Sequence, residues 1–133
     1  MIYLDTNIFI YPISGTDVKS ATCGAILDKV FKGEEKAGTS CLTWDEFQYA
    51  LKKVIGKENA IASGAILINS PNLTFFKTDL QVIQKAQTIT EEYGIAPRDA
   101  IHAATAMINN CSEIVSDDPD FDKIKGLKRR KIN

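Results

Sequence analysis

The chain opens with Met1-Ile2-Tyr3-Leu4-Asp5-Thr6-Asn7-Ile8-Phe9, an apolar run that ends at a carboxylate. Ile2, Tyr3 and Leu4 favour extended structure and predict a short buried strand. Asp5 then falls at the carboxyl end of that strand, which is where open α/β sheets bind ligands. Asp5 is therefore either a ligand-binding group or the cap of a helix that starts near Asn7, because aspartate is a good helix cap.

The bulk composition is that of a globular protein. Of the 133 residues, 44% are hydrophobic and 25% charged, and we expect a single domain over residues 1–133. The net charge of −1 excludes the global basic field of many nucleic-acid binders. The three cysteines form no CxxC or Cys/His motif, which argues against a disulfide framework or structural zinc and favours a reducing cytoplasm. We expect no signal peptide, because Asp5 interrupts the first apolar run, and no membrane span.

Strand patterns alternate with helical patterns along the whole chain. The expected strands are residues 2–4, 36–40, 73–76, 113–116 and 127–132, and the expected helices are 7–11, 17–32, 43–55, 57–69, 78–93 and 98–109. This alternation predicts a three-layer α/β/α sandwich around a central, mainly parallel sheet of four to five strands. Asp5 and the Asp117–Asp118 pair both follow strands, so we expect them on the same side of the sheet.

Local signals add expectations about helix ends and helix faces. Pro12, Ser14 and Gly15 are expected to end the first helix after about Tyr11. Thr43 with Glu46, and Thr78 with Gln81, match the capping-box pattern at a helix start. Apolar residues at helical spacing are expected to face the core: Trp44, Phe47, Leu51 and Val54 in one helix, and Ile61, Ala65 and Ile68 in the next.

Asp99 lies in the first turn of a helix that is otherwise almost uncharged. Either it complements the helix dipole, or it is a partly buried carboxylate that needs a cation, supplied by Arg98 or by a metal ion. Glu46 has the same two readings, as a capping-box member or as a site residue. His102, the only histidine, is expected to be a packed, hydrogen-bonded core residue rather than a ligand.

An acidic cluster follows the expected strand near residue 115. Asp120 and Asp122 fit a solvated turn, whereas the strand end directs at least one of Asp117 and Asp118 toward the ligand side of the sheet. Carboxylates at several such positions, without His or Cys partners, favour Mg²⁺ or Mn²⁺. The matching chemistry is metal-assisted hydrolysis of a phosphodiester, and no phosphate-binding glycine loop competes with it.

Four segments carry a resemblance that spans nearly the whole chain: Leu4–Asn7, Thr43–Phe47, Arg98–Ala106 and Ile114–Phe121. In this order and at these separations, they resemble the PIN domain, the ribonuclease fold of VapC-type toxins in toxin–antitoxin pairs. The resemblance implies Mg²⁺- or Mn²⁺-dependent cleavage of single-stranded RNA to a 5′-phosphate and a 3′-hydroxyl. It also implies a cognate antitoxin partner and a homodimer.

The resemblance assigns the metal and catalytic roles to Asp5, Glu46, Asp99 and Asp118. Glu46 is preferred to its neighbour Asp45 for two reasons. Phe47, Leu51 and Val54 define the inner face of this helix, and Glu46 is the acidic member of the expected capping box. Asp118 is preferred to Asp117 because the late motif reads Thr or Ser, any residue, then Asp. Supporting polar positions are Thr6, Asn7, Ser116 and Asp117.

Two alternatives stay open. One is a catalytically silent PIN-fold module that binds RNA or a partner in RNA processing. The other is a phosphatase; a haloacid dehalogenase would need a second aspartate where Asn7 stands. The basic run from Lys123 to Lys131, with Lys128, Arg129, Arg130 and Lys131 expected to be exposed, fits either an RNA backbone contact or a solubilising edge strand.

Overall fold

The computed structural model describes residues 1–132 and contains one sheet of parallel strands. The strands are β1 (Ile2–Leu4), β2 (Ala37–Ser40), β3 (Leu73–Phe76), β4 (Glu113–Val115) and β5 (Arg129–Arg130). Their order in the sheet is β3-β2-β1-β4-β5, and each neighbouring pair is parallel. The positions of the first four predicted strands and the parallel pairing are confirmed.

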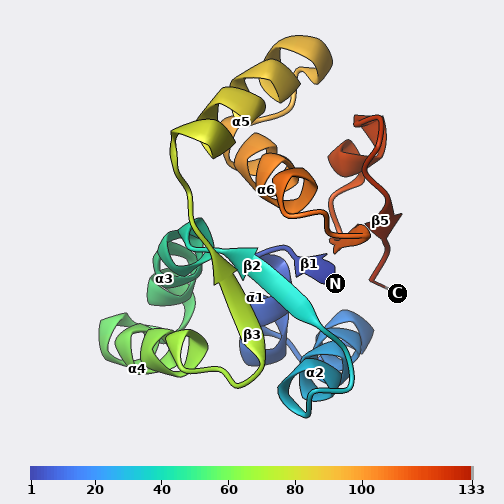
Figure 1. Cartoon of the computed structure of the whole chain (residues 1–133). Coiled ribbons are helices and arrows are strands. Elements are labelled where there is room, and N and C mark those ends of the chain that lie inside the picture. The colour runs from blue at the N-terminus through green and yellow to red at the C-terminus, as the bar shows by residue number, and fades with distance from the viewer. Residues whose placement is uncertain (133) are drawn as a thin grey trace.

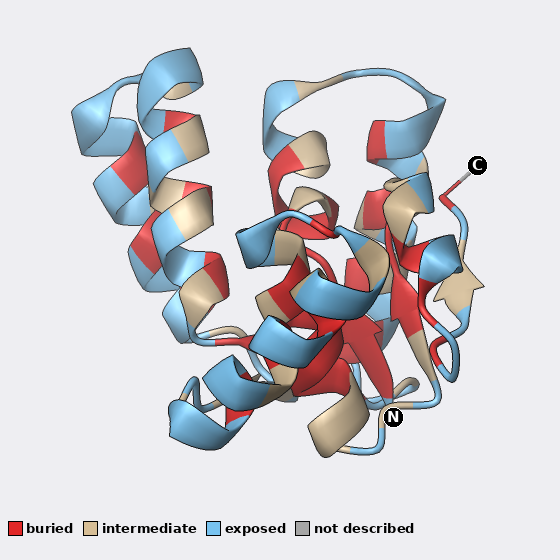
Figure 2. Cartoon of the chain, turned by 90° about the horizontal axis from the view of Figure 1, so that it is seen from above, coloured by how far each residue is buried: buried red, intermediate tan, exposed pale blue. Residues whose placement is uncertain are grey.

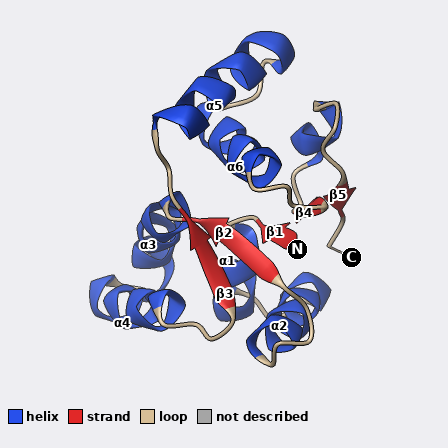
Figure 3. Cartoon of the chain, in the orientation of Figure 1, coloured by secondary structure: helices blue, strands red, loops and turns tan. Residues whose placement is uncertain are grey.

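Helices cover both faces of this sheet, which confirms the three-layer sandwich (Figure 1 and Figure 3). The helices are α1 (Asn7–Ser14), α2 (Val18–Phe31), α3 (Leu42–Ile55), α4 (Lys57–Ile68), α5 (Leu80–Tyr93) and α6 (Pro97–Ile108), with a 3₁₀ turn η1 (Pro119–Lys123). One core lies between the sheet and α1 to α4, and a second lies between the sheet and α5, α6 and η1.

The central strand β1 contributes to both cores. Successive side chains of a strand point to opposite faces, so Ile2 and Leu4 join the core under α1 to α4, while Tyr3 joins the core under α5 and α6. All three side chains are buried. Figure 2 shows that buried residues gather along the strands in the middle of the fold. The opening apolar run is therefore the middle of the sheet.

The chain reverses its direction of travel across the sheet between β1 and β4. It adds β2 and β3 on one side of β1, then crosses over to place β4 and β5 on the other side. Such a reversal leaves a crevice at the carboxyl ends of the two strands. Asp5 follows β1 directly, and Asp118 follows β4 after two intervening residues, so both lie at these strand ends as expected.

Both predicted capping boxes are wrong, because the hydroxyls involved bond to other elements. The Thr43 hydroxyl bonds the Thr39 hydroxyl of β2 at 2.7 Å. The α3 cap residue, Cys41, makes no side-chain capping bond. In α5 the cap is Asp79, whose carboxylate accepts a backbone amide of the first turn at 3.2 Å. The Thr78 hydroxyl instead bonds a serine hydroxyl of β2.

The predicted inner faces of α3 and α4 are partly wrong. Phe47 and Leu51 are buried, but Trp44 and Val54 are 45% and 60% exposed. In α4 the buried residues are Ala60, Gly64 and Leu67, whereas Ile61, Ala65 and Ile68 are exposed. The reason is close packing of α4 on α3, since a Cβ on Gly64 would lie 2.0 Å from Nε2 of Gln48. Gly64 leaves room at this point for the Gln48 side chain, which bonds the Ala60 carbonyl at 2.6 Å.

Two chain segments also differ from expectation. The first helix does not end at Pro12 but continues to Ser14, and the Gly15 amide donates to the Tyr11 carbonyl at 3.0 Å to complete its last turn. The last strand is limited to Arg129 and Arg130, and both residues are half-buried rather than exposed. Within residues 1–132, no helix combines the length and the apolar character needed to traverse a bilayer.

Candidate metal centre

The four acids singled out from the sequence line one cleft, of about 230 Å³, at the carboxyl end of the sheet. Asp5 follows β1, Glu46 lies in the second turn of α3, Asp99 in the first turn of α6, and Asp118 directly precedes η1. Asp45, the alternative to Glu46, instead lines a separate groove between α3 and α4. The structure thus brings together side chains from four distant parts of the chain.

Asp5 is held in place by two donors. Its Oδ1 accepts the Thr6 amide at 2.7 Å, and its Oδ2 accepts the Ser116 hydroxyl at 2.7 Å. The reading of Asp5 as a helix cap is wrong, because the cap residue of α1 is Thr6. The Ser116 bond joins the ends of β1 and β4, so the predicted supporting role of Ser116 matches its position. Thr6 and Asn7 also line the cleft.

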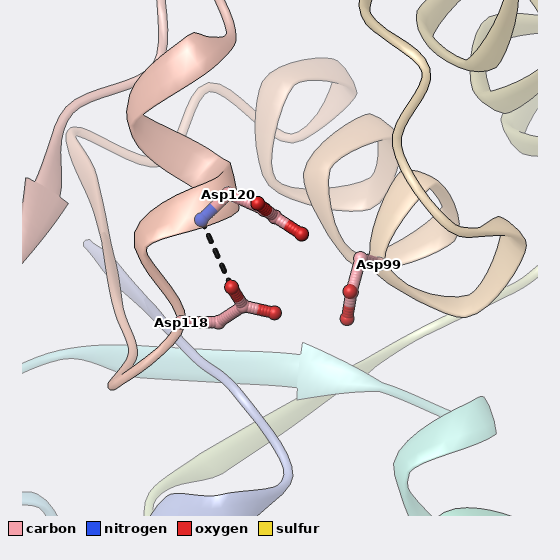
Figure 4. Close-up of side chains that lie close together, drawn as sticks. All are labelled: Asp99, Asp118 and Asp120. Carbon is pink, nitrogen blue, oxygen red and sulfur yellow. Dashed lines mark hydrogen bonds between the residues drawn. The ribbon is translucent and has the colours of Figure 1, made fainter.

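Asp99, Asp118 and Asp120 form the tightest group of acids, with one carboxylate oxygen from each lying within 4.8 Å of the others (Figure 4). Asp118 is oriented by the Asp120 amide, which donates to its Oδ1 at 2.9 Å. Asp120 lies in a solvated turn, as expected, since its side chain is 44% exposed and pairs with Lys123 at 3.1 Å. Its closeness to Asp118 follows from their two-residue spacing in this tight turn.

The carboxylates perturb one another. Burial, together with the negative charges of Asp118 and Asp5, raises the pKa of Asp99 to about 7. A proton or a cation in the cleft relieves the repulsion that causes this shift. Arg98 lines the same cleft, but it makes no salt bridge with any acid among residues 1–132.

Asp117 points away from the cleft. Its Oδ2 accepts Lys19 Nζ at 2.7 Å and the Tyr11 hydroxyl at 3.3 Å, which ties the end of β4 to α1 and α2. The structure therefore places Asp118, and not Asp117, beside the other acids.

His102 lies beneath the acids and is fully buried. Its Nε2 lies 2.6 Å from Oε1 of Glu46 and 3.7 Å from Oδ1 of Asp5. Burial lowers the pKa of His102, but the hydrogen bond with Glu46 and the charges of Asp5, Glu46 and Asp99 raise it by more, so the net pKa is raised. The expected packed, hydrogen-bonded histidine is confirmed, and one of its partners is a cleft acid. Tyr49 and Ile10 also line the cleft, unforeseen from the sequence.

The donor set fits a hard divalent cation. The cleft offers carboxylate oxygens from several residues without any thiolate, and His102 is already engaged by Glu46. Mg²⁺ and Mn²⁺ prefer such oxygen ligands and keep water in their remaining positions. The close approach of the Asp99 and Asp118 carboxylates is unfavourable when both are ionised, and either a proton or a bound cation relieves it.

The basic C-terminal run is largely paired within the chain. Arg129 donates to Asp122 through two nitrogens and to the Ser116 carbonyl, and its side chain is 6% exposed. Arg130 bonds Glu113 and Glu35. The expectation that both arginines are exposed is wrong, because their acid partners come from elsewhere in the fold.

Fold and cleft together define an α/β protein with an acidic crevice suited to a divalent cation. The sequence matches the family model of the PIN domain over residues 2–127, so the chain belongs to the PIN domain family. The predicted resemblance is confirmed. No curated protein matches the sequence at a significant level.

Solved structures of toxin–antitoxin complexes share the fold. VapBC2 from Rickettsia felis, bound to a DNA fragment from its promoter, aligns with a TM-score of 0.76 and 23% identity over 100% of both chains. DNA-bound VapBC from Salmonella typhimurium gives a TM-score of 0.74 and 20% identity over 99% of this chain and 98% of that one. The sarcin-ricin loop cleaving toxin VapC20 of Mycobacterium tuberculosis gives 0.73 and 16% over 92% and 93%.

Proposed function

We propose that this protein is a Mg²⁺- or Mn²⁺-dependent endoribonuclease that hydrolyses phosphodiester bonds of single-stranded RNA, and that it is the toxin of a toxin–antitoxin pair. The observation that carries the proposal is the meeting of Asp5, Glu46, Asp99 and Asp118 in one cleft. Membership of the PIN family and a fold shared with VapC toxins support it.

In the proposed reaction the four acids would hold the cation beside the scissile phosphate. When bound, the cation lowers the pKa of a water molecule and neutralises charge on the phosphoryl oxygens. Asp99 or Asp118 accepts a proton as the water oxygen attacks phosphorus. The bond from phosphorus to the 3′ oxygen then breaks, and that oxygen takes up a proton. The products are a 5′-phosphate and a 3′-hydroxyl.

An apolar groove supports the partner side of the proposal. A hollow of about 310 Å³ lies between α1, α2 and α4, and no titratable side chain lines it. Ile13 and Ile66 are 44% and 72% exposed at this groove. A small antitoxin that places apolar side chains here would cover them, so Ile66→Asp is expected to weaken its binding.

Exposed apolar side chains on α3 to α5 support the proposed homodimer. Trp44, Val54, Ile61, Leu80 and Ile83 are between 42% and 70% exposed. Apolar surface of this kind is typical of a face covered by another protein. Light scattering on the purified protein tests the dimer, and Val54→Glu with Leu80→Glu is expected to shift it toward monomer.

The nuclease assignment is tested by cleavage of a labelled single-stranded RNA with and without EDTA, beside Asp99→Asn. We expect cleavage only with added Mg²⁺ or Mn²⁺, and a loss of more than about 100-fold in the variant, since a lost ligand costs more than a lost supporting contact. Cleavage that persists in EDTA would refute the metal-dependent mechanism. An intact protein that binds RNA without cutting it would favour the silent binding module.

A further inference from the structure

His102 sits at the centre of a buried hydrogen-bond chain that ends on a cleft acid. On one side, its Nδ1 lies 2.5 Å from the Tyr3 hydroxyl. On the other, its Nε2 lies 2.6 Å from Oε1 of Glu46 and 3.2 Å from the Thr6 hydroxyl. His102 and Tyr3 are fully buried, so water does not compete for these bonds. These hydrogen bonds connect the central strand β1 to α3 through His102 of α6.

The partners fix the direction of each bond. The backbone amide of Ser40 donates to the Tyr3 oxygen at 3.0 Å, which leaves the Tyr3 O–H free to donate to Nδ1 of His102. Nε2 faces the carboxylates of Glu46 and Asp5, which accept but do not donate when ionised. In the neutral ring Nε2 therefore carries the proton and donates a hydrogen bond to Glu46, and a second proton on the ring leaves this hydrogen bond in place. A proton on Nδ1 alone would set the Nε2 lone pair against a carboxylate.

Each cleft acid except Asp99 has a dedicated donor. Asp5 has the Thr6 amide and the Ser116 hydroxyl, and Asp118 has the Asp120 amide. For Glu46 the only such donor among residues 1–132 is Nε2 of His102. Glu46 needs it most, because its longer side chain has more torsions to immobilise than an aspartate.

We propose that His102 is a positioning residue, which holds Glu46 Oε1 so that the carboxylate is fixed toward the cleft for the incoming cation. The inference deepens the proposed function and rests on it. Hydrogen-bond partners of ligating carboxylates orient the ligand, and their loss lowers metal affinity by about 10- to 100-fold. His102 thus acts through Glu46 without touching the reacting atoms.

The first measurement is the affinity for Mn²⁺ by calorimetry, without RNA, in the full-length protein after removal of any histidine tag. His102→Leu is expected to bind Mn²⁺ about 10- to 100-fold more weakly than the wild type. His102→Gln is expected to recover part of the loss, because its amide nitrogen can reach the position of Nε2. Tyr3→Phe, which removes the donor to Nδ1, is expected to weaken binding by about 10-fold or less.

The second measurement reads the tautomer directly. The chain has one histidine, so a long-range ¹H–¹⁵N spectrum of the untagged protein contains the signals of one imidazole. We expect Nε2 to be protonated, and its chemical shift to change in Glu46→Gln. A neutral ring with its proton on Nδ1 overturns the inference, and this test does not depend on any variant of His102 folding.

The outcomes separate the inference from the proposed function. Wild-type protein that binds Mn²⁺ and cleaves RNA, with affinity within twofold in both His102→Leu and Tyr3→Phe, overturns the positioning role alone. Equal losses in the leucine and glutamine variants, matched by equal losses of thermal stability, also overturn it, because they indicate packing alone. Wild-type protein that binds no Mn²⁺ refutes the proposed function and the inference together.

Discussion

The acid cleft and the basic C-terminal run, residues 123–131, differ in how their charged side chains are arranged. In the cleft, Asp99 and Asp118 approach each other, and the pKa of Asp99 rises to about 7. In the basic run, Arg129 pairs with Asp122 at 2.8 Å and Lys123 with Asp120 at 3.1 Å. The cleft concentrates like charge, whereas the run pairs opposite charges.

This difference indicates that the acids of the cleft serve activity, whereas the charges of the basic run serve the stability of the fold. Like charges held together lower the stability of the fold, and an arrangement of that kind persists where activity requires it. Paired charges stabilise the fold and leave less charge for a ligand. The comparison therefore supports the proposed cation site in the cleft and indicates that the arginines mainly hold β5 in place. It also weighs against the run as the main RNA contact.

The largest expected effect distinguishes two neighbouring acids. Asp118→Asn is expected to lower the rate of RNA cleavage by more than about 100-fold, because it removes a cleft carboxylate. Asp117→Asn is its matched control, since that side chain bonds Lys19 and Tyr11 outside the cleft. Cleavage rates under saturating Mn²⁺ check the pair. Equal losses of cleavage rate in the two variants would place both acids in the site and contradict the assignment of Asp117 to contacts outside the cleft.

The next effect concerns the paired region. Arg129→Met is expected to lower the free energy of unfolding by about 2 kcal/mol, because it removes charged hydrogen bonds of a nearly buried side chain to Asp122 and to the Ser116 carbonyl. Urea unfolding followed by circular dichroism measures this. Lys131→Met is the control, as that residue is exposed. A stability loss as large in the lysine variant would contradict the assignment.

A smaller change in the free energy of unfolding, an increase rather than a decrease, is expected when the Asp99 carboxylate is removed from the metal-free cleft. In the metal-free folded protein the pKa of Asp99 is about 7, above its ordinary value of 3.8, so the folded state holds a proton that the unfolded chain releases. This stabilisation is complete below about pH 4 and is lost as pH rises through about 7. The loss is about 1 kcal/mol after allowance for solvent screening.

Asp99→Asn should remove that pH dependence, and in EDTA at pH 8 it should be more stable than the wild type. Thermal unfolding of both proteins from pH 4 to pH 8 measures the difference. Added Mn²⁺ should stabilise the wild type more than the variant. A wild type that gains stability relative to Asp99→Asn as the pH rises without metal would reverse the predicted sign.

The smallest effect is expected in the exposed part of the basic run. Lys125 and Lys131 are exposed and form no salt bridge within residues 1–132. Changing both to alanine is expected to alter RNA cleavage by less than about twofold. If the run follows the RNA backbone instead, the slope of binding affinity against salt concentration would fall by about 0.7 for each lost phosphate contact. Filter binding at several salt concentrations decides between these results.

Local sequence patterns correctly predicted those strands and helices that depend on a few consecutive residues. The strand before Asp5, the helix around Asp99 and the strand before Asp118 each follow from a few consecutive residues. The alternation of strands and helices was enough to place these acids on one side of the sheet. The role of Asp5 could not be decided from its own segment, because Ser116, which orients it, is 111 residues away.

The predictions of buried helix faces, helix caps and exposed arginines failed where contacts between distant elements decide the outcome. Helical spacing shows which residues share a face but not which neighbour that face meets. Ile61 was therefore predicted to be buried, although Gly64 makes the close contact with α3. The hydroxyl of Thr43 matched a cap but bonds Thr39 across the fold. Arg130 looked exposed because its partners, Glu35 and Glu113, lie far from it in sequence.

The pairing of β1 with β4 has a consequence during synthesis. Strand β1 is translated before β2 and β3, but its neighbour β4 and the acid after it follow more than 100 residues later. A chain that has been translated only to a point before residue 118 lacks one cleft acid, and without β4 the sheet has no crevice beside Asp5. The nascent chain therefore cannot assemble the cleft until residue 118 has been translated, even though Asp5 and Glu46 were made much earlier.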